Sequence, residues 1–296
     1  MSKCAACGKG GDNLKVCTSC EQVSYCNAKC RKAHRSKHKK ECRQYTAEIR
    51  DRNALIRARV DAISEKLCSI EITDEELFAD PPPKEDCDIC FIPMSGLRTV
   101  YQPCCGKTLC NECMSAAQNE INKGNMKRCC SFCRVPLPKT INEKVERVKK
   151  RMALNDANAF YEISGWYYTG NCGLPQDLWK AFEMFNRGAE LGSVGAHCLL
   201  ANVYQNGEGV EKDEEKAEHH LMLAATGGND LARNMLGDAE VDRGNINRAM
   251  RHYMIAARCG WDNALKKVGE GYKAGYITQK TSMLRHYVLT NTLEMR

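Results

Sequence analysis

Two dense arrays of cysteines, at residues 4–42 and 87–133, constrain the folding of this chain more than any other feature. Of its 20 cysteines, 17 lie within the first 133 residues, and many form Cys-x-x-Cys pairs that place two sulfurs on one tight turn. The chain shows no secretory signal pattern and no apolar run of membrane-spanning length. We therefore expect an intracellular protein, cytoplasmic and/or nuclear and without membrane contact, whose thiols bind metal rather than form disulfides.

The first array is too short and too polar to fold around an apolar core. Its apolar residues are little more than Leu14, Val16, Val23 and Tyr25. A structural zinc site supplies on the order of 10–16 kcal/mol of apparent binding energy, which then stabilises the fold. The candidate ligands are Cys4, Cys7, Cys17, Cys20, Cys26, Cys30, His38 and Cys42. Eight ligands make two closed tetrahedral sites, which leaves no open position for catalysis by the metal.

This spacing resembles that of the MYND finger, which we expect at residues 1–42. The resemblance implies a cross-brace in which the ligand pairs interleave between two zinc ions. It gives the first ion the ligands Cys4, Cys7, Cys26 and Cys30. It gives the second ion the ligands Cys17, Cys20, His38 and Cys42. His34 is a rival imidazole, but the family spacing favours His38.

The MYND resemblance also implies a role in protein binding, because these fingers bind short proline-rich peptides. The family often has Gln directly after the sixth cysteine and Trp four residues further on. This chain has Arg31 and Arg35 at those positions. The departure puts the usual peptide groove in doubt and favours an acidic partner.

Basic residues are concentrated in the same region. Residues 1–50 carry 12 Lys and Arg against 4 Asp and Glu, which is a net charge of +8. The whole chain has a net charge of +7, so the remaining residues together carry −1. The basic run at residues 29–43 could contact nucleic acid, or it could be a solvated face that offsets the charge of the zinc-thiolates. We favour the solvated face over a nucleic-acid-associated regulator, because no aromatic residue is interleaved for base stacking.

A helical linker is expected at residues 43–84. Apolar residues from Ile49 to Ile70 recur at steps of four and three, with Asn53 among them. This stripe fits a short coiled coil or a helix packed on its own neighbouring domains. We favour packing within the chain, because Arg52 and Arg57 would face each other in a parallel dimer. Pro81, Pro82 and Pro83 then form an extended spacer that marks a boundary.

The second array predicts a further zinc finger at residues 85–138. The order of its cysteine pairs resembles a RING domain of the all-cysteine variant. The resemblance implies a first zinc held by Cys87, Cys90, Cys110 and Cys113. It implies a second zinc held by Cys104, Cys105, Cys130 and Cys133. Lys107 occupies the usual histidine position, and adjacent ligands on one ion require strain, so Cys129 is an alternative to Cys104.

A RING-type resemblance implies recruitment of a ubiquitin-conjugating enzyme, with no catalytic residue in the finger itself. By resemblance, the contact residues are Ile89, before the second cysteine, and Arg134, after the last. Against this reading, Ser131 replaces the usual proline. The alternative is a finger that is purely structural or binds another protein.

The remainder of the chain repeats. Ile163, Leu200, Leu236 and Val268, each followed by a small residue, recur at intervals of 37, 36 and 32 residues. The segment from Tyr204 to Ala217 resembles the Sel-one-like repeat, a relative of the tetratricopeptide repeat. We expect an all-α solenoid at residues 139–296 that begins with a basic capping helix and offers a surface to proteins or peptides. Tyr204, Tyr253 and Tyr272 occupy core-like positions.

The expected architecture is therefore a multidomain one, in which two small zinc-stabilised cross-brace fingers precede a helical-repeat solenoid. The first functional reading is a zinc-binding interaction protein that acts as a RING-type ubiquitin ligase. The second is a non-enzymatic adaptor with several interaction modules. Both predict two zinc ions in each finger.

Overall fold

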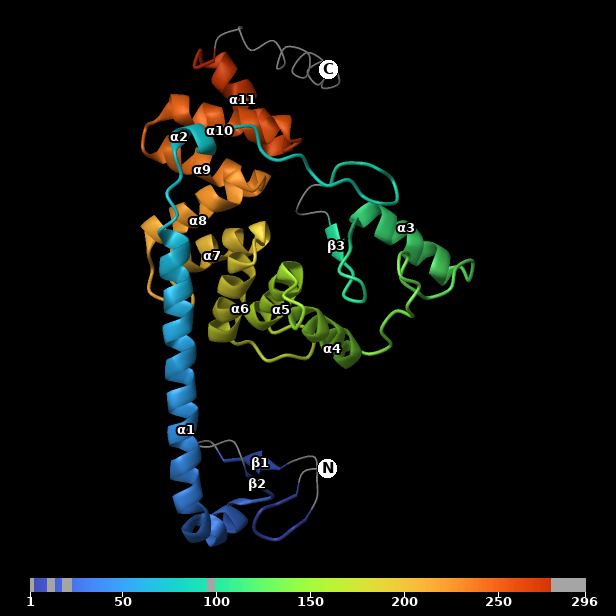
Figure 1. Ribbon diagram of the computed structural model, residues 1–296, viewed down its shortest axis with the longest axis vertical. Coiled ribbons are helices and arrows are strands. Elements are labelled where there is room, and N and C mark those ends of the chain that lie inside the picture. The colour runs from blue at the N-terminus through green and yellow to red at the C-terminus, as the bar shows by residue number, and fades with distance from the viewer. Residues whose placement is uncertain (1–2, 10–13, 18–22, 95–98, 278–296) are drawn as a thin grey trace. The chain divides into compact units, whose positions relative to one another are not determined.

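The computed structural model describes residues 3–9, 14–17, 23–94 and 99–277 (Figure 1). The chain divides into two compact units, residues 1–62 and residues 63–296. The described residues follow the expected class, with a zinc-finger region at the N-terminus and a helical-repeat solenoid in the second unit.

The first unit is built from a small hairpin and the start of a long helix. Strands β1 (Lys15–Val16) and β2 (Ser24–Tyr25) pair antiparallel, with Lys15 opposite Tyr25. Helix α1 (Ala28–Cys68) follows at once and has 41 residues without glycine or proline. The Asn27 side chain accepts a hydrogen bond from the Cys30 backbone N–H at 2.8 Å and so caps the helix.

Helix α1 begins earlier than the apolar stripe indicated. The sequence predicted a helical linker from residue 43, with an apolar stripe from Ile49, whereas the structure starts the helix inside the first finger, at Ala28. Most residues of its first half are Lys, Arg, Ala, Glu or Gln, which favour helix without burial. Apolar periodicity does not detect a solvated helix of this kind.

The second unit opens with a short helix and a finger. Helix α2 (Asp74–Leu77) is closed by a capping box between Thr73 and Glu76. Strands β3 (Thr99–Tyr101) and β4 (Thr108–Cys110) form an antiparallel hairpin, and α3 (Asn111–Asn122) follows directly. The Cys110 sulfur accepts from the Cys113 backbone N–H, so one residue serves both as a helix cap and as a candidate ligand.

The solenoid consists of antiparallel helices joined by short turns. They are α4 (Ile141–Met152), α5 (Ala157–Thr169), α6 (Leu178–Glu190), α7 (Val194–Asn206), α8 (Glu214–Thr226), α9 (Asp230–Asp242), α10 (Ile246–Arg258) and α11 (Asp262–Lys273). Most begin at an Asp, Asn, Ser or Thr whose side chain accepts a hydrogen bond from a backbone N–H of the first turn. Helices α5 and α7 end at Gly170 and Gly207, both left-handed, with φ of 72° and 71°.

Small residues fill the positions where these helices cross. Ala181, Ala196, Ala201, Ala232 and Ala249 are fully buried. Of the three tyrosines expected in the core, Tyr204 and Tyr253 are buried. Tyr272 is 45% exposed, because it lies on α11, the last helix among the described residues.

The finger of the second unit is seated on the solenoid through Tyr101. Its ring packs with Val145 and Val148 of α4 and with Ile163 and Trp166 of α5. Its hydroxyl donates to Asp156 at 2.7 Å, and Asp156 also pairs with Arg151. This contact was not predicted from the sequence, because Tyr101 and Asp156 are 55 residues apart and belong to no motif.

Candidate metal centres

Three Cys-x-x-Cys pairs fold into the same tight turn, which we call a knuckle. In each knuckle the backbone N–H of the fourth residue after the first cysteine donates to that cysteine's carbonyl. The donors are Gly8, Phe91 and Arg134, at 2.9, 2.8 and 3.1 Å. All three have positive φ, between 57° and 71°. The turn points both sulfurs to one side, where one ion can meet them.

The first cluster joins one knuckle to the start of α1. The ligand atoms of Cys4, Cys7, Cys26 and Cys30 all lie within 4.8 Å of one another. The sulfurs of Cys7 and Cys26 are 3.7 Å apart, and those of Cys26 and Cys30 are 3.5 Å apart. A tetrahedral zinc with Zn–S bonds of about 2.3 Å requires sulfurs about 3.8 Å apart. The geometry therefore fits zinc.

The second cluster contains Cys17, His38 and Cys42, whose ligand atoms also lie within 4.8 Å of one another. Its fourth expected ligand, Cys20, lies outside the described residues. His38 and Cys42 are one turn apart on α1, so they face the same side. His34 is instead in contact with the Tyr25 hydroxyl, at 3.2 Å from its Nδ1. The structure thus brings His38, rather than His34, to the ligands.

The third cluster is made by the knuckle at Cys87 and by the junction of β4 with α3. It contains Cys87, Cys90, Cys110 and Cys113, with the sulfurs of Cys90 and Cys110 at 3.7 Å. Cys87 is fully buried. Leu109 packs beside it in a small apolar cluster.

The fourth cluster contains Cys104, Cys105, Cys130 and Cys133, with the sulfurs of Cys105 and Cys130 at 3.9 Å. Adjacent cysteines reach one site because a turn carries them, closed by the Gly106 backbone N–H donating to the Gln102 carbonyl at 2.8 Å. The left-handed residue of this turn is Gly106, at φ 79°. Cys129 is not part of the cluster. Lys107 donates to Asp88 at 2.7 Å and is not a ligand.

The acidity of the thiols is consistent with metal binding. A backbone hydrogen bond from Cys26 lowers the pKa of Cys4 to about 6, whereas hydrogen bonding with the Cys26 sulfur raises the pKa of Cys30 to about 12. In the third cluster, burial acts to raise the pKa of Cys87, but backbone hydrogen bonds from Cys110 and Cys90 outweigh it and lower the pKa to about 6. Sulfurs this close cannot all ionise without a cation, and a dication removes that conflict.

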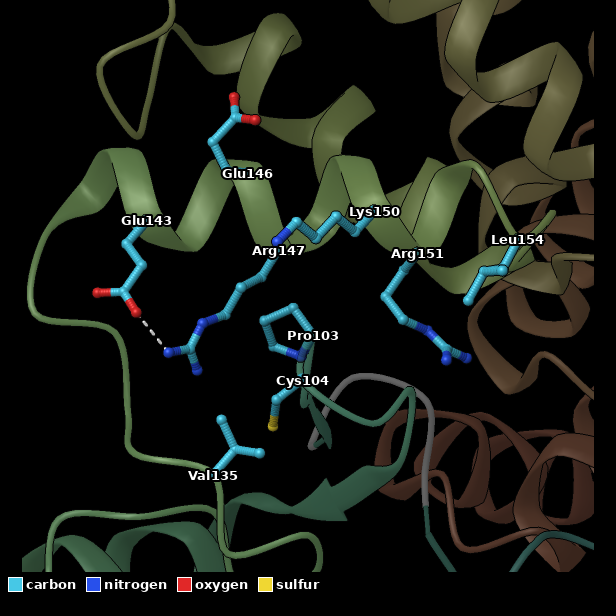
Figure 2. Close-up of a pocket in the computed structure, with 9 residues that line it drawn as sticks. All are labelled: Pro103, Cys104, Val135, Glu143, Glu146, Arg147, Lys150, Arg151 and Leu154. Carbon is cyan, nitrogen blue, oxygen red and sulfur yellow. Dashed lines mark hydrogen bonds and ion pairs between the residues drawn. The ribbon is translucent and has the colours of Figure 1, made fainter.

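Helix α4 borders the fourth cluster. A cavity of about 460 Å³ lies between this helix and the turn that carries Pro103 and Cys104. Figure 2 shows Arg147 and Arg151 extending from α4 toward that turn. Arg147 also donates to the Pro136 carbonyl, just after the last knuckle, at 2.8 Å. The cations offset the negative charge that four thiolates leave around one Zn²⁺.

Exposed apolar side chains gather on the two knuckles of the second finger. Ile89, expected from the sequence as a contact residue, is 42% exposed. Phe91 and Ile92 follow it at 76% and 62%, and Val135 is 39% exposed. Arg134, the other expected contact, is also exposed. Sequence reasoning missed Phe91, Ile92 and Val135, although their place directly after a zinc knuckle could have indicated them.

The first finger carries a basic cavity beside its second cluster. Its walls include Tyr25 and the ligands Cys17 and Cys42, together with the cations Arg31, Lys32, Arg35, Lys39, Arg43 and Arg50. Arg31 and Arg35 are the residues that replace the family's Gln and Trp. Both of them line this cavity.

Known families account for both ends of this arrangement. The model of the MYND finger matches residues 4–42, and that of the Sel1 repeat matches residues 159–193, 194–229 and 230–261. Together with the clusters, these matches define a zinc-finger protein with a helical-repeat array. The chain carries one MYND finger and three Sel1 repeats, and its cysteine clusters fit zinc. Both modules bind proteins, so the chain is a zinc-binding interaction protein.

Individual relatives resemble only parts of the chain. Cytochrome c oxidase assembly factor 7A of Xenopus laevis is 34% identical over 64 residues, which are 22% of this chain and 28% of that protein. The chain thus spans less than a third of the length of this curated relative.

Two solved structures are also similar. A Sel1 repeat protein from Oxalobacter formigenes has 26% identity and a TM-score of 0.46, over 60% of this chain and 74% of that one. A protective antigen of uropathogenic Escherichia coli with an SLR fold has 27% identity and a TM-score of 0.44, over 51% and 33%.

None of the helices in the described part of the chain combines the length and apolar character that crossing a membrane requires.

Proposed function

We propose that this protein is a RING-type ubiquitin ligase in which the second finger holds a ubiquitin-conjugating enzyme. The MYND finger and the Sel1 repeats bring other proteins to it. The observation that carries the proposal is the set of exposed apolar side chains on the two zinc knuckles, Ile89, Phe91, Ile92 and Val135, which we call the patch. A small metal finger that served structure alone would not leave three large apolar residues of one knuckle in water.

The patch is suited to docking because the knuckles fix its backbone. Phe91 donates its N–H to Cys87, and Cys87 in turn donates to the Ile92 carbonyl at 3.0 Å. Val135 accepts from Cys130 at 2.8 Å in the matching position of the last knuckle. A partner that binds here therefore orders few further backbone torsions, which lowers the entropic cost of association.

Ligation by such a finger requires orientation rather than covalent chemistry. The conjugating enzyme carries ubiquitin as a thioester, and holding that thioester in a reactive geometry accelerates the attack of an amine. Arg134, exposed beside the patch, would brace the ubiquitin through hydrogen bonds from its guanidinium. No residue of this chain needs to enter the reaction.

Four zinc ions per chain would complete the proposed sites, two in each finger. Cys20 would complete the second cluster. The proposed division of the chain is a MYND finger at 1–42, a helical linker at 43–84, a RING-like finger at 85–138 and the repeats at 139–296. The linker assignment concerns sequence position, since residues 63–84 pack within the second unit.

The test is discharge of ubiquitin from a panel of charged conjugating enzymes by the full chain. We expect discharge that falls at least tenfold in Ile89→Ala, because the change removes apolar contact area from the patch. The control is Val241→Ala, which trims a similarly exposed apolar residue on α9 and should leave discharge unchanged.

A chain that keeps its zinc and discharges no enzyme of the panel would refute ligation. The chain would then be a non-enzymatic adaptor. Lys107 is the observation that favours this second reading, because it stands where the RING pattern has a histidine and pairs with Asp88 instead.

A further inference from the structure

Residues 72–84, expected to form part of a linker and proline spacer, lie against the Sel1 array as a bound peptide would. We call this segment the strap. Leu77 inserts between helices α7, α8 and α9, where it is 2% exposed. It packs there with Ala201, Leu221, Ala224, Ala225, Ala232 and Leu236. Figure 1 shows α2 of the strap beside the helices of the array.

The next residue, Phe78, occupies a cage of cationic and aromatic groups on α10. The guanidinium carbon of Arg251 lies 3.6 Å from the centre of the phenyl ring, and that of Arg248 lies 5.0 Å from it. The His252 ring is 4.6 Å away. A cage of this kind selects an aromatic side chain, because cations are attracted to the face of the ring.

Charged groups hold both ends of the strap. Asp74 pairs with Arg248 at 2.5 Å, and Asp80 pairs with Arg258 at 2.8 Å. Further along, Lys84 donates to Asp230 and to the Cys259 carbonyl, at 2.5 and 2.6 Å. The array thus offers arginines to an acidic segment.

The array also forms a hydrogen bond with the backbone of the strap. The buried Arg233 on α9 donates one guanidinium N–H to the Leu77 carbonyl and another to the Ala225 carbonyl. A hydrogen bond to a main-chain carbonyl does not depend on which residue carries it. An apolar pocket, an aromatic cage, flanking arginines and a backbone contact are together the parts of a peptide-binding site.

We propose that the array surface under the strap is a binding site for an acidic peptide segment that carries an adjacent leucine and aromatic residue, and that the strap is its intramolecular occupant. This inference deepens the proposed function, because it gives the Sel1 repeats a partner chemistry. A partner protein with such a segment competes with the strap. The strap therefore sets the affinity that a partner needs in order to bind.

The strap is covalently linked to the array, so a competing peptide needs high affinity to displace it. A segment linked by a few residues has an effective concentration on the order of 1 mM at its own site. A free peptide of equal intrinsic affinity, present at micromolar concentration, displaces very little of it. Weakening the strap should therefore expose the site to a peptide in solution.

The probe is a fluorescein-labelled peptide with the sequence of residues 72–84, and binding to the full chain is measured by anisotropy. We expect Leu77→Ala/Phe78→Ala to bind the probe at least tenfold more tightly than the unaltered chain. A control peptide with the same two alanines should bind at least tenfold more weakly. Arg251→Gln added to the opened variant should weaken the probe severalfold, since it removes one wall of the cage.

A second variant decides the matter if the first fails to fold. Asp74→Asn/Asp80→Asn removes two ion pairs whose carboxylates are 61% and 73% exposed, so the array should remain folded. We expect about a threefold gain in affinity for the probe over the unaltered chain. The proposal is overturned if a folded variant gains no affinity, or if it binds the alanine peptide equally well.

Occupancy by a second copy of the chain would look different. A dimer of the unaltered chain that dissociates in Leu77→Ala/Phe78→Ala would assign the site to the strap of another copy and overturn the partner assignment. No conjugating enzyme is present in these measurements. Their failure would leave the ligase proposal untouched, and failure of ubiquitin discharge would leave this site untouched.

Discussion

The residue with positive φ in each knuckle differs between the two fingers. In the MYND finger it is Gly8, which adopts positive φ without steric cost, whereas the second finger has Phe91 and Arg134 there. A bulky residue in this region is strained by about 1–2 kcal/mol. Strain of this kind is tolerated where the exposed side chain is needed, which supports a contact role for both residues.

A pair of buried histidines, His197 and His220, lies in the repeats. The Nδ1 atoms of His197 and His220 are 3.1 Å apart, so one imidazole donates and the other accepts. Burial, followed by the neighbouring imidazoles, lowers the pKa of His220 to about 3 and that of His197 to about 4. Both rings are therefore neutral in the folded chain at pH 7.

The pair should make the array sensitive to acid. In the unfolded chain a histidine has a pKa of about 6.5. Between this pH and about pH 4, the unfolded state therefore binds protons at these histidines and the folded state does not. Stability is then complete above about pH 6.5 and is lost as pH falls toward 4. Between pH 7 and pH 5, each histidine should lower the free energy of unfolding by about 2 kcal/mol.

Urea unfolding followed by tryptophan fluorescence measures this effect cleanly, because Trp166, Trp179 and Trp261 all lie within the repeats. His220→Gln should reduce the loss of stability between the two pH values by about half of the pair's contribution. An unchanged loss in this variant would show that the pair does not carry the pH dependence.

At the scale of single residues, the sequence predicted the ligand clusters better than the contact surfaces. Every expected ligand among the described residues lies in the cluster that the family resemblances implied for it. Local spacing suffices there, because each knuckle is a short turn. The strap was not foreseen, because the role of Leu77 and Phe78 depends on helices more than 120 residues away.

At the scale of the helices, close crossings decide which small residues are required. Gly237 on α9 and Gly269 on α11 occupy equivalent positions in the repeat. A Cβ atom on Gly237 would lie 2.4 Å from the ring of Tyr253, whereas one on Gly269 would meet nothing within 4 Å. Tyr253 is buried and its hydroxyl donates to Asp238 at 2.5 Å, so its ring cannot easily move aside.

These two glycines therefore make a matched pair of substitutions. Gly269→Ala should stabilise the chain by up to about 1 kcal/mol, because alanine favours helix over glycine. Gly237→Ala should instead destabilise it by about 1–3 kcal/mol through overpacking. Equal effects in urea unfolding would show that α9 and α10 do not cross as closely as described.

The boundaries of some helices could be predicted from sequence patterns, and those of others could not. Caps and glycines bound the solenoid helices, and these residues act within a few positions of themselves. Helix α1 was only half foreseen, because its first half buries few side chains and relies on propensity and on the ligands Cys30, His38 and Cys42. Periodicity reports burial and therefore does not detect a helix that is solvated.

At the scale of the whole molecule, metal ligation stabilises the fingers and apolar packing stabilises the helical repeats. The fingers bury few apolar side chains besides their ligands, whereas the Sel1 array has continuous apolar clusters. Tyr101 joins the second finger to this array within the second unit. The exposed residues on the knuckles of the second finger therefore depend on the cysteine clusters being filled, whereas the strap lies on helices that pack without metal.

Zinc analysis of the purified full chain tests that dependence most directly. We expect about four zinc ions per chain. We expect about three in Cys104→Ser, which removes a cluster ligand, and still four in Cys129→Ser, which changes a cysteine outside the clusters. Two or fewer zinc ions in the unaltered chain, or equal loss in both variants, would contradict the assignment of the cysteine clusters as closed zinc sites.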